Sequence, residues 1–178
     1  MGRIVHPRQV LFDRLSFTLL VLWLGMSLGF VLTSPLLFAN LPKNTAGIVA
    51  GHMVERLDLL AWIAFGGAWI LTGLPHWMYQ ENNSLPITPG KLWNFTILTA
   101  LIFCLGSSFI LTPKLDSIMS ALSVIPPPEI SQQEELLQSR DRAHRFSVQF
   151  FAIRMVLAVT LSWGLTRLQK DLTSTRVR

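Results

Sequence analysis

Arg154 is the residue whose chemistry most needs an explanation. It lies inside an apolar stretch of twenty residues, 146–165, which is long enough to cross a bilayer as a helix. A charged side chain in such a stretch is costly, and it usually marks an internal partner, a bound ligand or an ion path. The rest of the chain must therefore supply groups that could neutralise this arginine.

Two acids and a pair of adjacent glycines in the second apolar stretch are the candidate neighbours. If the chain crosses the membrane four times, this stretch and the one around Arg154 begin on the same side. The glycines would leave backbone carbonyls open to the guanidinium, and the acids would lie within reach of a snorkelling side chain. We therefore predict an intrachain polar anchor, with a partner subunit, a lipid headgroup or pigment, and anion transport as alternatives. The residues assigned to the anchor or partner contact are Arg154, Asp58, Glu55, Gly66 and Gly67.

Histidines offer the other possible ligand chemistry. His52 and His144 would share one side of the membrane and could hold a haem between helices. Closed metal sites usually need three or four ligands, and no His-x-x-x-His, Cys-x-x-Cys or carboxylate cluster accompanies these residues. We therefore expect no metal site and no cofactor, with haem as the open alternative. The sequence also lacks a nucleophile motif and paired acids within the spans, so we expect no enzymatic activity.

Composition places the chain in the membrane class. Hydrophobic residues make up 51% of the chain and charged residues only 14%, and the mean hydropathy is +0.45. The net charge is +5, but Lys and Arg gather at the chain ends and in loops. This placement predicts topology signals and contacts with lipid headgroups, and it argues against nucleic-acid binding.

Hydropathy predicts an all-α fold in one domain, 1–178: a bundle of four transmembrane helices. We expect short amphipathic, interfacial helices in the first and third connections, and a polar helical extension at about 132–145 before the last span. In the third connection, Thr112 is predicted to cap a new helix whose first turn holds Pro113. The predicted spans are about 15–38, 57–77, 92–111 and 146–165.

Glycines and positive charges predict packing and orientation. Gly25 and Gly29 form a Gly-x-x-x-Gly pair, for which packing inside the bundle is favoured over homodimerisation. Eight Lys and Arg residues fall on the side of the two termini and six on the other side. The positive-inside rule then predicts that both termini are cytoplasmic, in a bacterial inner membrane or another energy-coupling membrane.

Several short motifs resemble a known family. They occur in order over residues 15–167, and they resemble the uncharacterised four-span membrane domain of unknown function 4149, related to eukaryotic transmembrane protein 205. The resemblance implies a four-helix membrane protein without an established bacterial activity. The motifs are Trp23-Leu-Gly25, Pro35-Leu-Leu-Phe38, Leu41-Pro42, Ala46-Gly-Ile-Val-Ala-Gly51, Pro113-Lys-Leu-Asp-Ser-Ile-Met119 and Arg142-Ala-His-Arg-Phe-Ser147.

Size, packing faces and the lack of catalytic groups together predict a function. We expect a non-enzymatic accessory or assembly subunit that contacts membrane lipids and other membrane protein subunits. The alternative is a small transporter or a membrane protein that binds a ligand such as an anion or haem.

Overall fold

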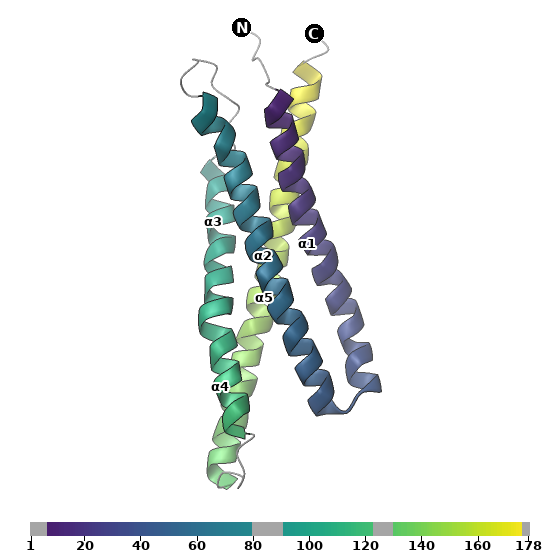
Figure 1. The fold of residues 1–178 in the computed structure, drawn as a ribbon, viewed down its shortest axis with the longest axis vertical. Helices are drawn as coiled ribbons and strands as arrows, with labels where there is room; N and C mark the ends of the chain where they lie inside the picture. Colours follow the sequence, from purple (N-terminus) through teal and green to yellow (C-terminus); the bar gives the residue numbers. More distant parts are fainter. Residues whose placement is uncertain (1–6, 80–90, 123–129, 176–178) are drawn as a thin grey trace.

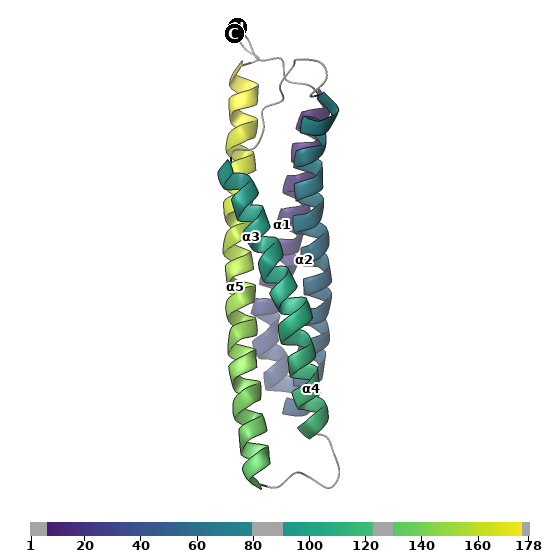
Figure 2. The same cartoon turned by 90° about the vertical axis from the view of Figure 1, so that its left-hand side faces the viewer.

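The helices of the protein lie side by side in an elongated bundle (Figures 1 and 2). The computed structural model describes residues 7–79, 91–122 and 130–175, and all regular structure in these ranges is helical. The start of α1 and the end of α5 lie at the same end of the bundle (Figure 1), and we call the opposite end the distal end. The elements are α1 (Pro7–Asn40), α2 (Lys43–Tyr79), α3 (Lys91–Gly106), the π-helix η2 (Ser107–Leu111), α4 (Thr112–Leu122) and α5 (Ile130–Thr175).

Three segments of the described chain are long and apolar enough to cross a membrane. They are Val10–Asn40, Leu92–Ala121 and Gln133–Thr166. Large apolar side chains cover their outer faces, including Leu32, which is 67% exposed, and Phe109, which is 71% exposed. This surface is consistent with an integral membrane protein. α2 is not among the three segments, so the predicted span at 57–77 stays a prediction.

A buried stripe on α1 faces the other helices. Asp13, Ser16, Leu20, Trp23 and Ser27 are all buried and follow a three-and-four spacing, which places them on one helical face. The inner faces of α2, α3 and α5 carry small residues, which let helix backbones approach closely. The alanines of the buried core cluster are Ala61, Ala64 and Ala68 of α2, Ala100 of α3 and Ala158 of α5.

The first connection differs from its prediction, because it contains no separate interfacial helix. α1 and α2 are joined by a tight turn in which the Leu41 N–H donates to the Leu37 carbonyl at 3.0 Å. The Ala46 N–H then donates to the Pro42 carbonyl at 2.9 Å, so α2 starts at once. The mildly polar segment before the predicted second span is therefore the first part of one 37-residue helix.

The third connection also differs, because α3, η2 and α4 form one continuous helical path. Thr112 has helical dihedral angles, φ −60° and ψ −53°, and does not cap a new helix as predicted. Its backbone N–H donates to the Ser107 carbonyl five residues earlier, which is the π-helical pattern. Pro113 supplies the physical reason: it lacks an N–H and crowds the preceding turn, and a wider turn relieves that conflict without ending the helix.

α5 is the longest helix, with 46 residues from Ile130 to Thr175. At about 1.5 Å per residue it measures roughly 69 Å, which exceeds the hydrocarbon thickness of about 30 Å. Its first part contains the segment predicted as a polar extension, and α4 packs against it at the distal end. Ile118 of α4 and Ala143 of α5 are both buried there.

Glycines of α1 and α3 have contrasting surroundings. Gly25 and Gly29 are exposed, and a Cβ added at either would meet nothing within 4 Å. The prediction that this pair packs inside the bundle is therefore wrong: the pair lies on the face of α1 away from the buried stripe. At Gly106, in contrast, an added Cβ would lie 2.7 Å from the Phe150 ring of α5.

We expect Gly106→Ala to lower the free energy of unfolding by about 1–2 kcal/mol, because the new methyl group overlaps the Phe150 ring. Gly25→Ala is the matched control, and we expect it to raise the free energy of unfolding by up to about 1 kcal/mol, because its new methyl group meets open space and alanine is the better helix former. Detergent titration monitored by circular dichroism would measure both. If adding Phe150→Leu to Gly106→Ala restored none of the lost free energy of unfolding, the steric explanation would be contradicted.

Candidate functional site

A buried ion pair joins α5 to α2 near the middle of the bundle. Arg154 Nη2 lies 2.6 Å from Asp58 Oδ1, and the two side chains are 1% and 6% exposed. Burial of an isolated charge in an apolar region is very costly, whereas a paired charge is tolerated. Arg154 is therefore neutralised by a carboxylate of the same chain, which lies beside it at the same depth in the bundle.

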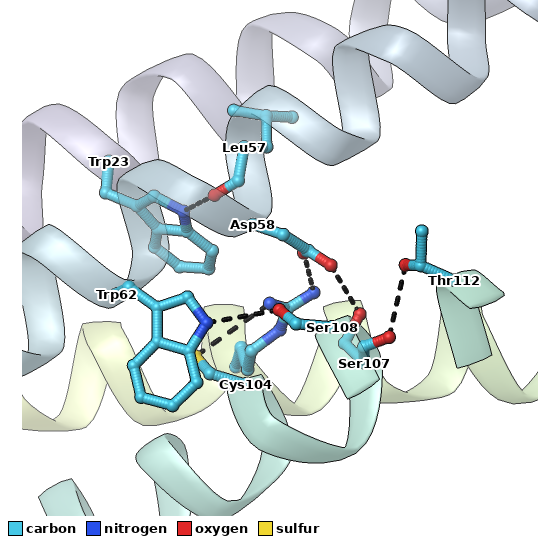
Figure 3. A network of polar contacts seen from close by, with 9 residues as sticks. Trp23, Leu57, Asp58, Trp62, Cys104, Ser107, Ser108 and Thr112 are labelled. Carbon is cyan, nitrogen blue, oxygen red and sulfur yellow. Dashed lines mark hydrogen bonds and ion pairs between the residues drawn. The ribbon is translucent and has the colours of Figure 1, made fainter. Parts of the chain in front are cut away.

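The π-helix brings a third helical path into this pair. The Ser107 hydroxyl donates to Asp58 Oδ2 at 2.6 Å, so both carboxylate oxygens have a polar neighbour (Figure 3). The Thr112 hydroxyl donates to the Ser107 carbonyl at 3.1 Å, which helps to hold the wide turn. Asp58 thus accepts from η2 on one side and faces the guanidinium of α5 on the other.

Softer groups complete the surroundings of the guanidinium. Arg154 Nη1 lies 3.9 Å from the buried Cys104 sulfur, and its Cζ lies 5.8 Å from the centre of the Phe151 ring. The second contact has cation–π geometry. Arg154 Nε has no hydrogen-bond acceptor among the described residues. The guanidinium therefore retains unused donor capacity at Nε.

Two tryptophans fix α2 on either side of Asp58. The Trp23 indole N–H donates to the Leu57 carbonyl at 2.9 Å, which ties α1 to the residue before Asp58. The Trp62 indole N–H, one turn further along α2, donates to the Ser108 hydroxyl at 3.1 Å. Figure 3 shows both bonds beside the contacts of the carboxylate. These bonds set the rotation and depth of α2 relative to its neighbours.

This arrangement suits a structural role, in which polar contacts hold three helical segments together. We name the side chains of Arg154, Asp58 and Ser107 the buried polar cluster, and they come from α5, α2 and η2. Inside a low-dielectric region their attraction is strong, but it only offsets the cost of removing both charges from water. We therefore expect the cluster to contribute to which helices meet, and at what depth, more than to net stability.

Only part of the predicted anchor is assembled as expected. Asp58 meets Arg154 directly, whereas Glu55 is exposed and lies 3.6 Å from His52. Gly67 faces α1, since a Cβ added there would lie 3.0 Å from Leu19. The described contacts of the guanidinium include neither Gly67 nor Gly66. The arginine is thus paired laterally and does not snorkel towards a carboxylate at the helix end.

The predicted histidine ligands lie apart from this cluster. His52 Nδ1 faces Glu55 at the exposed start of α2, and its side chain is 75% exposed. His144 is exposed on α5. Across residues 7–79, 91–122 and 130–175, no group of three or more His, Cys, Asp and Glu side chains is placed to hold a metal ion.

Sequence reasoning missed the residues that η2 contributes. From the sequence alone, Ser107 and Ser108 are only small residues within an apolar span. Cys104 is a single cysteine in the same span. A signal was present in their spacing before Pro113, because a proline within an apolar helix often accompanies a widened turn. The Ser107 hydroxyl would then be expected to donate a hydrogen bond to an acceptor on a neighbouring helix.

Comparison with known proteins identifies the family. A family model described as "Domain of unknown function (DUF4149)" matches residues 18–122, more than half of the chain. The chain belongs to this family. The matched region includes Asp58 and Ser107, while Arg154 follows it on α5. The buried polar cluster therefore joins the family domain to the last helix. Comparisons with curated proteins and with solved structures find no match.

Proposed function

We propose that this member of the DUF4149 family is a four-span, non-enzymatic accessory or assembly subunit of a larger membrane complex. The observation that carries the proposal is the internal pairing of Arg154 with Asp58, 2.6 Å apart and buried. The two charges of this pair are used inside the chain to hold α2 and α5 together. Binding to other subunits is then left to the outer faces and to the ends of the bundle.

α2 serves as the fourth span in this proposal. It runs beside α1 over most of its length (Figure 1), and its apolar stretch is interrupted by Asp58. Because Arg154 neutralises that carboxylate, α2 can lie at membrane depth without an exposed charge. Both termini would then lie on one side of the membrane, and the larger number of Lys and Arg residues on that side favours the cytoplasm.

The distal part of α5 is the polar surface that a partner subunit would contact. Its charged side chains are exposed, and α4 covers only one of its faces. Polar helices beyond the lipid suit lateral contacts with water-exposed domains of other subunits. The exposed charged residues of this surface include Glu134, Glu135, Asp141 and Arg145.

A small transporter or a ligand-binding membrane protein is the second candidate. It is favoured by Arg154 Nε, a buried donor without an acceptor among the described residues. Such a donor could receive an anion. In the first candidate, the same donor would receive an ordered water molecule.

Native purification in mild detergent distinguishes the two candidates. We expect a membrane partner to co-purify in stoichiometric amount with the wild type, and to be lost from Arg145→Glu on the distal part of α5. Arg14→Glu, an exposed arginine at the other end of the bundle, is the matched control and should retain the partner. A lone monomer that carries haem absorbance, or that takes up an anion in vesicles, would reject the subunit proposal.

A further inference from the structure

An apolar groove lies where α3 and η2 border α5. Its volume is about 460 Å³, within the range of roughly 300–1,000 Å³ that is typical of small-molecule sites. It is lined by residues of the segment between Ile102 and Leu111 and by Phe150 of α5, and every lining residue is apolar. The groove can therefore hold a hydrocarbon chain and offers no side-chain polar group to a headgroup.

The walls of the groove are held in place by the packing of two helices. The Phe103 and Phe150 rings meet edge to face, with centroids 4.9 Å apart and an interplanar angle of 86°. Gly106 leaves the space that the Phe150 ring fills. Phe109, which is 71% exposed, stands on the outer wall. The groove is thus formed by ordered contacts and opens on the outside of the bundle.

Two basic residues follow the walls of the groove towards the distal end. Lys114 comes four residues after Ile110, on the same side of its helix, and Arg142 comes eight residues before Phe150, a little more than two turns away along α5. Both are exposed, and neither forms an ion pair with another described residue. The nearby Arg140 is different, because it pairs with Asp141 at 3.2 Å.

We propose that this groove binds an anionic phospholipid. One acyl chain lies in the groove, and the phosphate lies between Lys114 and Arg142. Along α5, the eight residues from Phe150 to Arg142 rise by about 12 Å, which separates the hydrocarbon from the headgroup in the direction that a lipid requires. Charge complementarity selects an anionic headgroup, and the apolar lining selects an acyl chain. This proposal goes beyond the subunit function and does not depend on it.

Native mass spectrometry of the full-length protein tests the proposal, with phosphatidylglycerol and phosphatidylcholine of the same acyl chains as probes. We expect the wild type to retain phosphatidylglycerol preferentially. The double variant Lys114→Gln/Arg142→Gln should lose roughly thirtyfold of that preference, because each basic residue near an anionic headgroup contributes about fivefold. Arg140→Gln, whose arginine is engaged by Asp141, should leave the preference unchanged.

The groove itself is tested separately. Phe109→Ala removes part of the wall and should lower phosphatidylglycerol retention by roughly fivefold. Phe95→Ala removes an exposed phenylalanine of the same helix outside the groove and should have no effect. Equal retention by Phe109→Ala and wild type would overturn the proposal, as would an unchanged preference in the double variant. Displacement of the lipid by inorganic phosphate would overturn it too, since it would indicate a site for the free anion.

Discussion

Asp58→Asn is expected to destabilise the protein by about 3–5 kcal/mol, because it leaves Arg154 buried without a counter-charge. Asparagine keeps the size of the side chain and can still accept from Ser107, so the loss reports the charge. Arginine cannot release its proton within a protein, and the uncompensated charge therefore persists. Detergent-induced unfolding in mixed micelles measures the change in free energy.

Removing the other partner should cost less. In Arg154→Leu, the Asp58 carboxylate keeps the hydrogen bond that the Ser107 hydroxyl donates, which offsets part of the cost of its burial. We expect a loss of about 2 kcal/mol, smaller than that of Asp58→Asn. Glu55→Gln is the matched control on the same helix, and it should change stability by less than about 0.5 kcal/mol because Glu55 is exposed. Equal losses for Asp58→Asn and Glu55→Gln would contradict the assignment of Asp58.

Trp23→Ala is expected to have the second large effect, a loss of about 3–5 kcal/mol. The Trp23 side chain is 1% exposed and packs against Phe65 at 5.2 Å and Phe151 at 6.2 Å between ring centroids. Its truncation would leave a cavity between α1, α2 and α5. The Leu57 carbonyl would also lose the hydrogen bond that the indole N–H donates. The same unfolding measurement applies.

Trp23→Phe separates these two contributions. It retains most of the ring packing but removes the N–H that donates to the Leu57 carbonyl, so about 1 kcal/mol should be lost. Trp163→Ala, on an indole that is 60% exposed on α5, is the comparison for a surface position. If Trp23→Ala were no more destabilising than Trp163→Ala, α1 would not be packed as described.

Much of the fold was predictable because hydropathy reports it directly. The all-helical class follows from long apolar stretches, and the family was recognisable from short motifs, as the match over residues 18–122 confirms. The errors arose where one helix continues through a segment that looks like a boundary. Thr112-Pro113 has the residue types of a helix start. In the structure, however, the preceding π-helical turn accommodates the proline, and the helix continues through it.

The candidate site was predictable only in part, because depth along a helix is not encoded locally. Asp58 was identified as a possible partner of Arg154. Because Asp58 lies near the start of the predicted second span, the arginine was expected to extend its side chain towards the membrane surface to reach it. Lateral pairing required the rotation of α2, which the bonds of Trp23 and Trp62 fix. Those contacts join residues 34 and 46 positions apart, beyond the reach of helical periodicity.

A double-mutant cycle on Asp58 and Arg154 tests the central claim most directly, namely that these side chains neutralise each other between α2 and α5. The cycle compares Asp58→Asn, Arg154→Leu and the double variant by unfolding in mixed micelles. We predict that the double variant is more stable than Asp58→Asn alone, with a coupling energy of about 3 kcal/mol, which exceeds the loss expected for Arg154→Leu. Additive losses, with a coupling energy near zero, would contradict the account.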